Sequence, residues 1–410
     1  MSEEIQRVEE VQGLFGPFQF PELLLQRLWA EQLFDRSHLR TQHGDPLRIL
    51  RGGRWNRQGG PDFRQAEIRI GERVVHGDVE LHLREPDWKA HQHASDPAFD
   101  EVVLHVVLFP TPRKYTRGTG GRQIPILILL PHLWHDLEEY AADAAVSAIA
   151  RRPADRLAEM WRDLGPEACR ERIVAEARKR WLGKVRYARV RIEKLGWAGA
   201  CHQTALEVLG YRFNRVPMLT IAAENPLEIW MAGEVAVESV FEQHRDRWQL
   251  SGVRPANHPR KRLHAYERWI KQGGDWPQTL QQLASTWPST PDHCSPLSDI
   301  AEIRRELGLK RWWEEVMQQI GVVDAVNRPR ADNLWGDGLL PLVVAEGALA
   351  EETGFLWWFG SWPGDQAASL TQAARMAGIA EGRRNPLAWG HVQGLIGYQL
   401  ATPESTGRGT

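Results

Sequence analysis

The 410-residue sequence lacks an apolar stretch long enough to cross a membrane. Its longest apolar run, residues 124–131, has 8 residues, whereas a membrane-spanning helix needs about 20. The acidic segment at residues 2–11 also lacks the hydrophobic region of a signal peptide. We therefore expect a cytoplasmic protein without a membrane partner.

Cysteine and net charge are also scarce. The three cysteines, Cys169, Cys201 and Cys294, have no C-x-x-C spacing, which argues against a disulfide framework and against a cysteine zinc site. We expect buried, inert thiols. With 51 Lys and Arg against 53 Asp and Glu, the formal net charge of −2 makes no global case for nucleic acid as a partner, so any basic surface must be local.

Two residue types are abundant instead. Tryptophan occurs 19 times, mostly in segments with helical patterning, and we expect these side chains mainly in the core. Five of the 15 histidines fall within thirty residues, where an even distribution would put about one, and they are His76, His82, His91, His93 and His105. This concentration is the first indication of chemistry.

The N-terminal third has the pattern of a sheet with one leading helix. Apolar residues recur near helical spacing over residues 21–34. Short apolar or alternating stretches then predict five strands, at residues 46–50, 66–70, 79–83, 102–109 and 124–130. Residues 71–73 are a hairpin-turn candidate, and residues 113–123, with three glycines, are predicted to be an exposed loop. The fold class is therefore α+β, with a mixed β-sheet domain over residues 1–135.

Helical patterning dominates after residue 133. Apolar residues fall three or four apart across residues 170–195, the clearest helix of the chain. The same window holds ten Lys or Arg, including Arg178, Lys179 and Arg180, against three Glu. Such a run is usually a solvated helix face, and the alternative is a surface that contacts phosphate groups. We expect an all-helical domain over residues 136–400 and a disordered tail over residues 401–410.

The first candidate site lies around the predicted hairpin. Asp62 follows Gly-Gly-Pro, and residues 77–82 read Gly-Asp-Val-Glu-Leu-His. Alternate residues of a strand share a face, so Glu80 and His82 should point together. The return of the hairpin can bring Asp62 beside Glu80. Two carboxylates held in this way form an oxygen-rich site for Mg²⁺ or Mn²⁺, which can activate a water and neutralise charge on a phosphodiester.

A second candidate follows at His91 and His93. In a strand, an H-x-H pair presents two imidazoles on one face, which suits Zn²⁺ binding as well as hydrogen bonding to a phosphate. The alternative is a purely structural role for the pair. Lys89 is a neighbouring candidate for substrate binding, whereas His105, in an apolar strand, is predicted to be a satisfied core residue.

Two later segments carry weaker signals. Residues 254–262, with Arg254 and Arg260, combine two prolines with four basic residues. They could grip phosphate or simply fix the start of a helix. Residues 332–338 hold Asp and Asn but lack the ligand spacing of a calcium loop, so they are predicted to be a turn before a helix at Pro341.

The order Pro-Asp, a hairpin, then an acid two residues before a basic residue resembles the restriction-endonuclease-like nucleases. Their signature is Pro-Asp followed by Asp or Glu, any residue and Lys, on a sheet preceded by a helix that often supplies another Glu. Over about residues 20–110 the resemblance implies Asp62 and Glu80 as metal carboxylates and Glu22 or Glu31 as the helix carboxylate. His82 stands in the place of the lysine, and histidine titrates near neutrality and can ligate metal instead.

Eight separated blocks also look like one bacterial family, domain of unknown function 2851. They lie at residues 28–34, 60–63, 77–82, 87–93, 104–107, 209–214, 254–259 and 338–341. The resemblance implies that the polar positions in these blocks act as one unit, and it implies no particular activity.

Together these patterns predict a metal-dependent nuclease or related phosphodiesterase that acts on nucleic acid. Asp62 and Glu80 would hold the metal, His82 would stabilise or protonate, and His91 and His93 would complete the site. The basic helix at residues 170–195 would clamp the substrate backbone. The alternatives are a non-catalytic adaptor that binds nucleic acid or protein on a nuclease-like scaffold, and a small-molecule metalloenzyme that uses the histidine cluster.

Overall fold

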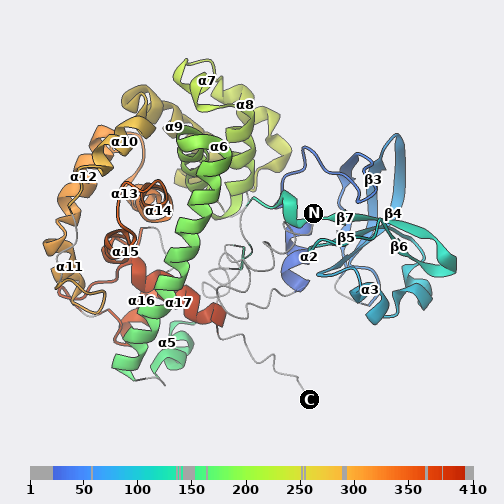
Figure 1. Ribbon diagram of the computed structural model, residues 1–410, viewed down its shortest axis with the longest axis horizontal. Helices are drawn as coiled ribbons and strands as arrows, with labels where there is room; N and C mark the ends of the chain where they lie inside the picture. Colours follow the sequence, from blue (N-terminus) through green and yellow to red (C-terminus); the bar gives the residue numbers. More distant parts are fainter. Residues whose placement is uncertain are drawn as a thin grey trace. The chain divides into compact units, whose positions relative to one another are not determined.

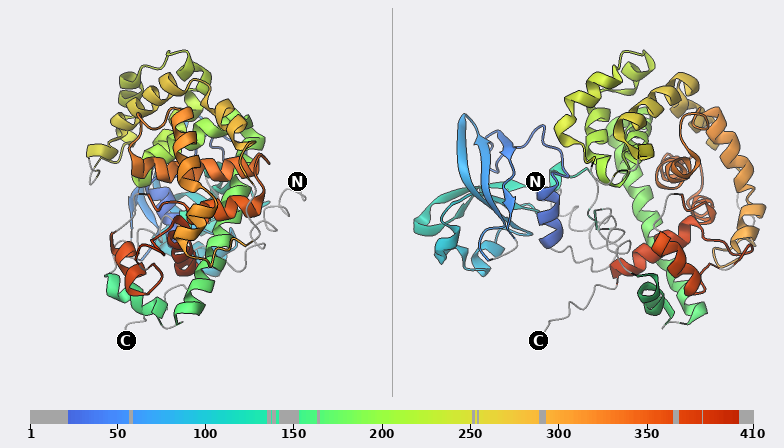
Figure 2. Two further views of the ribbon diagram at one scale, coloured as in Figure 1. Left: turned by 90° about the vertical axis from the view of Figure 1, so that its left-hand side faces the viewer. Right: turned by 180° about the vertical axis from the view of Figure 1, so that it is seen from behind.

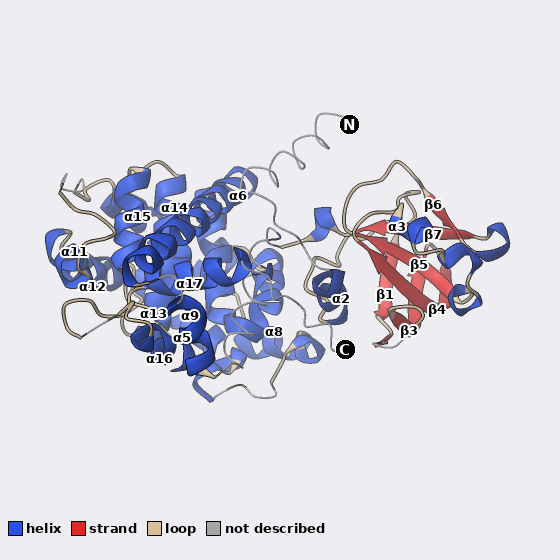
Figure 3. Ribbon diagram, turned by 90° about the horizontal axis from the view of Figure 1, so that it is seen from below, coloured by secondary structure: helices blue, strands red, loops and turns tan. Residues whose placement is uncertain are grey.

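In the computed structural model the chain divides into two units, Met1–Ala141 and Ala142–Thr410 (Figure 1). The first unit holds strands and short helices, and the second is built from helices. The structure describes residues 22–56, 59–134, 137, 140–141, 153–162, 165–250, 253, 255–288, 293–364, 368–380 and 382–401. All described strands belong to the first unit (Figure 3). The predicted α+β class, a mixed sheet with a leading helix followed by a helical region, is confirmed.

The sheet of the first unit has seven strands in the order β1-β3-β4-β5-β7-β6, with β2 paired to β3. The strands are β1 (Leu47–Arg51), β2 (Arg54–Trp55), β3 (Phe63–Ile70), β4 (Arg73–His82), β5 (Val102–Val107), β6 (Tyr115–Arg117) and β7 (Gln123–Ile128). The predicted hairpin at residues 71–73 joins β3 and β4, which are antiparallel. The β4–β5 and β5–β7 pairs are parallel, so β4 and β5 form the centre of a mixed sheet.

Helix α2 (Glu22–Ala30) packs one apolar stripe against this unit. Leu25, Leu28 and Trp29 are completely buried, and the Trp29 ring contacts Phe63 of β3 with 6.5 Å between ring centroids. The helix ends at Ala30, earlier than its apolar pattern suggests. Short helices fill the connections, namely α3 (Asp87–Ala90), η1 (His93–Ser95), η2 (Pro97–Phe99), η3 (Thr119–Gly121) and η4 (Leu130–His132).

The expectation of an exposed loop at residues 113–123 is wrong. Residues Tyr115–Arg117 form β6, which pairs antiparallel with β7 through Tyr115 and Pro125. The glycines make the turn of this hairpin, because Gly120 and Gly121 have φ values of +65° and +80°, where a side chain would be strained. The glycine count is therefore a signal for a turn between two strands.

The regular elements among the described residues of the second unit are all helices. Its α-helices are α5 (Ala154–Arg162), α6 (Pro166–Glu224), α7 (Leu227–Met231), α8 (Val237–Gln243), α9 (Pro259–Gly273), α10 (Trp276–Ala284), α11 (Ile300–Glu306), α12 (Leu309–Gln319), α13 (Arg328–Asn333), α14 (Leu340–Ala345), α15 (Glu351–Gly360), α16 (Ala368–Met376) and α17 (Trp389–Ala401). Two 3₁₀ turns, η5 (Arg245–Arg247) and η6 (Pro255–Asn257), also occur. The turn predicted at residues 332–338 is wrong, because α13 continues into a π-helix, η7 (Leu334–Leu339), which leads into α14. None of the described helices is both long and apolar enough to span a membrane.

The long segment α6 changes direction near Gly196, whose φ is +70°. Arg191 donates hydrogen bonds to Thr204 at 2.7 Å and to Glu207 at 2.7 Å. These partners lie 13 and 16 residues away, about 20 Å or more along a straight helix at 1.5 Å per residue. The chain must therefore fold back between them, and the predicted helix at residues 170–195 is the first arm of α6.

Helix α17 packs against α6 (Figure 2), and glycines of α17 lie at this contact. A Cβ atom added at Gly394 would lie 2.2 Å from the Ile173 carbonyl oxygen, and one at Gly397 would lie 2.9 Å from Glu176 Cβ. Glycine thus permits the close approach. Tryptophans fill much of the core, as predicted, and those with almost no exposed surface are Trp29, Trp161, Trp181, Trp269, Trp276, Trp335, Trp357, Trp358 and Trp389. Cys169 and Cys201 are buried as expected, whereas Cys294 is half-buried.

Candidate metal centre

Strand β4 brings the first two polar candidates into the middle of the sheet. Along the strand, Val79 and Leu81 alternate with Glu80 and His82, so the two polar side chains share a face. Glu80 is only 5% exposed and His82 only 1%. A buried carboxylate next to a buried imidazole is costly unless partners satisfy both groups.

The hairpin brings Asp62 to Glu80, as the sequence predicts. The Asp62 backbone N–H donates to Glu80 Oε2 at 2.9 Å, and the Leu81 N–H donates to Asp62 Oδ2 at 3.1 Å. Gln26 of α2 donates from Nε2 to Asp62 Oδ1 at 2.5 Å. Both carboxylates are therefore oriented by neighbouring N–H groups, and no sequence motif indicates the contribution of Gln26.

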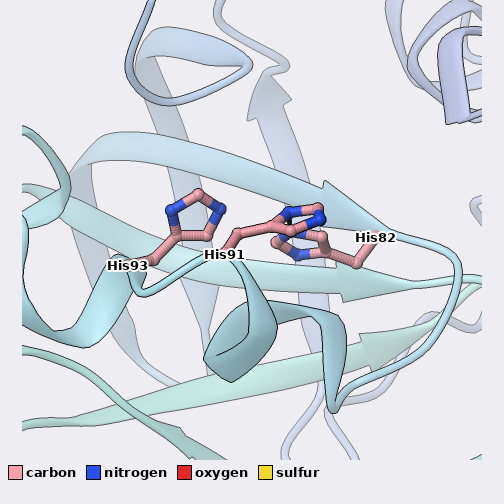
Figure 4. Close-up of side chains that lie close together, drawn as sticks. All are labelled: His82, His91 and His93. Carbon is pink, nitrogen blue, oxygen red and sulfur yellow. Dashed lines mark hydrogen bonds between the residues drawn. The ribbon is translucent and has the colours of Figure 1, made fainter.

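Three histidines converge on one face of the sheet (Figure 4), and Glu80 of the acidic pair lies beside them. One ring nitrogen of each of His82, His91 and His93 lies within 4.8 Å of the others. His82 Nε2 is 3.1 Å from His91 Nδ1, and Glu80 Oε1 is 3.3 Å from His93 Nε2 and 3.7 Å from His82 Nε2. His91 is exposed and His93 partly so, so the cluster reaches solvent at its His91 side.

The local structure around His91 and His93 differs from the prediction. The pair does not lie in a strand: His91 caps the end of α3 and His93 begins η1. Between them Gln92 has a φ of +61°, in the left-handed region that is uncommon for residues other than glycine. This bend turns both imidazoles toward His82, and the His93 ring stacks on Phe99 with 3.8 Å between centroids.

Burial sets the protonation of the cluster. Burial, followed by the neighbouring histidines, lowers the pKa of His82 to about 2, and burial lowers that of His93 as well. Burial also raises the pKa values of Asp62 and Glu80 well above their ordinary range, and the Glu80 charge adds to the effect on Asp62. Near pH 7 His82 and His93 are therefore uncharged and have lone pairs to offer. The pKa values of Asp62 and Glu80, raised to about 8, favour the protonated carboxyls unless a cation is bound beside them.

His105 forms a second layer behind His82. His82 Nδ1 is 3.0 Å from His105 Nε2, and His105 Nδ1 is 2.6 Å from the Thr116 hydroxyl. His105 has no exposed surface, so the prediction of a satisfied core residue is confirmed. A chain of this kind fixes the tautomer and the ring orientation of a histidine whose other nitrogen faces a ligand. No sequence pattern indicates Thr116, because it lies on the unpredicted strand β6.

The donor set suits a transition-metal ion. His93 Nε2 is buried and has no hydrogen-bond partner among the described residues, although it faces Glu80. A buried ring nitrogen in this position is satisfied by a metal ion or by a water. Three imidazoles beside a carboxylate are ligands for Zn²⁺ or Mn²⁺, whereas Mg²⁺ favours oxygen ligands. His82, His91, His93 and Glu80 are therefore the residues that could hold the ion.

Of the two helix carboxylates, only one interacts with this cluster. Glu22 interacts electrostatically with His91 and His93, and burial raises its pKa. It lies one helical turn before Gln26, on the same side of α2. Glu31 instead pairs with Arg27 at 2.8 Å on the exposed surface. The structure thus adds Glu22, and not Glu31, to the acidic side of the site.

The basic candidates have other positions. Lys89 lies exposed on α3. The remaining described candidates have protein partners: Arg178 pairs with Glu352 at 2.5 Å, Lys179 with Glu176 at 3.1 Å, Arg180 with Gln393 at 2.8 Å and Arg260 with Glu238 at 2.8 Å. Helix α9 begins at Pro259, in keeping with a helix start at residues 254–262. Arg254 itself lies outside the described residues.

The fold and this cluster define an α+β protein with a histidine- and carboxylate-rich centre on a mixed sheet. A family model described as "Protein of unknown function (DUF2851)" matches residues 22–241, and the chain belongs to this family. The match includes every residue of the cluster, from Glu22 to His105. No curated protein and no solved structure matches the chain.

Proposed function

We propose that the protein is a metal-dependent phosphodiesterase that cleaves nucleic acid in the cytoplasm. The observation that carries the proposal is the convergence of three imidazole nitrogens, within 4.8 Å of one another, beside the oriented carboxylates of Asp62 and Glu80. Structural histidines seldom leave a buried ring nitrogen without a hydrogen bond, as His93 does within the described part of the chain. A bound cation would satisfy that nitrogen and would favour the ionised form of the two buried carboxyl groups.

The residues would divide the work as follows. His82, His91 and His93 hold the ion, and the Glu80 carboxylate lies next to them. The ion, when bound, lowers the pKa of a water and neutralises charge on the substrate. His105 keeps the His82 ring oriented through its Nδ1 side. Asp62, fixed by Gln26 and by the Leu81 N–H, lies beside the ligands as the acceptor for a proton from water.

The choice of phosphodiester substrate follows from the resemblance to restriction-endonuclease-like nucleases. That resemblance rests on Pro61-Asp62, the hairpin and Glu80, and the Asp62–Glu80 contact supports it. The departure is His82 in place of lysine. In this structure His82 faces two other histidines, so we propose Mn²⁺ or Zn²⁺ rather than Mg²⁺ as the activating ion.

The test is metal-dependent cleavage by the full chain. Protein freed of metal with EDTA is incubated with labelled single-stranded DNA, double-stranded DNA or RNA, and with Mn²⁺, Zn²⁺ or Mg²⁺ in turn. Cleavage should require Mn²⁺ or Zn²⁺ and fall at least 100-fold in Asp62→Asn and Glu80→Gln, each shown to be folded by circular dichroism. His76→Asn, which changes an exposed histidine of the same strand, is the matched control. Equal activity in all variants, or none in the wild type, would refute the proposal.

A small-molecule metalloenzyme is the second candidate. It is favoured by the composition of the cluster, because the ring nitrogens that approach one another belong to three histidines. This reading predicts the same metal binding with no cleavage of any nucleic acid. Hydrolysis of a small generic ester or phosphodiester, lost in Glu80→Gln, would favour it.

A further inference from the structure

A hollow of about 330 Å³ opens at the free edge of the same sheet, where β1 pairs with β3. Its lining includes the side chains of Arg40, Arg48 and Arg69, together with His38, and no carboxylate is among the described residues that line it. The three arginines are exposed. We call this hollow the arginine groove. Its volume is at the lower end of the range for ligand sites, and its charge selects an anion.

Two of the arginines oppose each other directly. Arg48 of β1 and Arg69 of β3 are register partners, and both are without an ion pair in the described part of the chain. Like charges in this position destabilise a sheet. At the other end of the same strand pair, Arg51 forms an ion pair with Glu67 at 3.0 Å. Glu67 thus neutralises Arg51, whereas Arg48 and Arg69 have no such partner among the described residues and lie beside the hollow. This arrangement is typical of a site that binds an anion.

The arginine groove shares a face of the sheet with the metal centre. Arg69 is the register partner of Val74 in β4, and residues 74, 76, 78, 80 and 82 alternate along that strand. Where the pairing of β4 and β5 shifts in register, the extra residue belongs to β5. The side chains of β4 therefore alternate between the two faces of the sheet without interruption. Six residues separate Val74 from Glu80, about 20 Å at 3.3 Å per residue.

We propose that the arginine groove binds the phosphate groups of a nucleic-acid strand, roughly 20 Å along the sheet from the point where that strand meets the metal centre. The inference rests on the proposed function for its choice of nucleic acid. Arg48 and Arg69 supply the main contacts, and Arg40, whose guanidinium donates to the Gly44 carbonyl at 2.9 Å, is held at the rim. Arginine matches phosphate oxygens with two parallel donors, and the open edge of the groove accommodates a continuous strand.

The experiment measures binding without catalysis. The full chain in EDTA is titrated against a fluorescein-labelled 20-nucleotide single strand, and anisotropy is followed from 50 to 300 mM NaCl. Arg48→Gln combined with Arg69→Gln should weaken binding roughly tenfold at 50 mM NaCl and lower the slope of log K against log salt by about 1.4, or 0.7 per lost phosphate contact. Arg51→Gln, which removes an arginine already paired with Glu67, should change affinity less than twofold.

The fold of the double variant can be checked independently. Because the two positive charges oppose each other, their removal should leave the melting temperature unchanged or raise it. Weaker binding therefore reports the groove and not unfolding. Unchanged affinity in the double variant, or no binding of the strand by the wild type, would overturn the proposal. So would binding of inorganic pyrophosphate to the groove with no binding of the strand.

The outcomes separate this proposal from the proposed function. If the strand binds in EDTA through Arg48 and Arg69 but is not cleaved with any metal, the arginine groove is supported as a binding site and the phosphodiesterase proposal is refuted. If the wild type cleaves in a metal-dependent way but the double variant binds the strand as tightly as the wild type, the phosphodiesterase proposal is supported and the arginine groove is refuted as a binding site.

Discussion

Replacement of His91 by alanine offers the cleanest test of the metal centre. His91 is the exposed member of the cluster, and its Nδ1 lies 3.1 Å from His82 Nε2. Its removal deletes one of three imidazoles without opening a cavity in the core. The metal-free variant should therefore be as stable as the wild type to within about 0.5 kcal/mol.

The expected effect of metal follows from linkage. An ion that binds only the folded state at 100 times its Kd stabilises that state by about 2.7 kcal/mol. For a unit of this size, about 1 kcal/mol corresponds to roughly 3–4 °C, so the wild type should gain roughly 10 °C. If loss of one ligand weakens binding about 100-fold, the same metal concentration equals the Kd of the variant, and the gain falls to about 0.4 kcal/mol, or 1–2 °C.

The assay follows the melting temperature of the first unit in thermal unfolding. Protein treated with EDTA is compared with the same protein after Zn²⁺ or Mn²⁺ has been added back. His76→Ala is the matched control, since it removes an exposed histidine of β4 that is outside the cluster. It should retain the full gain. The reasoning is refuted if the wild type shows no metal-dependent shift, or if His91→Ala shifts as much as the wild type does.

Three further predictions concern the layers around the site and the helical unit. His105→Ala should weaken metal affinity 10- to 100-fold in an isothermal titration, because it removes the hydrogen bond behind His82, and unchanged affinity would contradict a positioning role. Burial lowers the pKa values of His202 and His391 to about 4, so the unfolded state binds more protons once the pH falls below about 6.5. Each histidine should then lower the free energy of unfolding by about 1.6 kcal/mol between pH 6.5 and 5, as urea unfolding would measure, and a flat profile would disprove this. Gly394→Ala should lower the free energy of unfolding by about 1–3 kcal/mol, since its Cβ would lie 2.2 Å from a carbonyl oxygen of α6, and an unaffected urea midpoint would argue against the close packing.

Local patterning was sufficient for the class of the fold and for part of the site. The alternation at residues 79–82 and the glycine turn at residues 71–73 together fix the β3–β4 hairpin, and that hairpin brings Asp62 to Glu80. Both facts are encoded within about twenty residues of sequence. The placement of Glu22 required only a helix before the sheet, which apolar spacing also indicates.

What sequence patterns did not predict depends on contacts between distant segments. The H-x-H spacing suggested a strand, yet the two imidazoles meet His82 because Gln92 adopts a left-handed conformation, and nothing in a Gln side chain signals that. Thr116 behind His105 depends on a three-residue edge strand, too short to have a readable pattern. Likewise, the ion pairs of Arg178 and Lys179 are set by tertiary packing and the helix surface, not by the count of basic residues.

The packing of α17 on α6 affects the order in which the chain folds during synthesis. Helix α17 ends at Ala401, while the α6 residues beneath it, Ile173 and Glu176, lie more than 200 positions earlier. Such late closure means that the helical unit stays open on the ribosome until α17 has been synthesised. The strands of the sheet unit pair with one another within residues 47–128, so this sheet is free to form first. Truncation near the C-terminus would therefore expose the tryptophan-rich interior to aggregation while leaving the histidine cluster assembled.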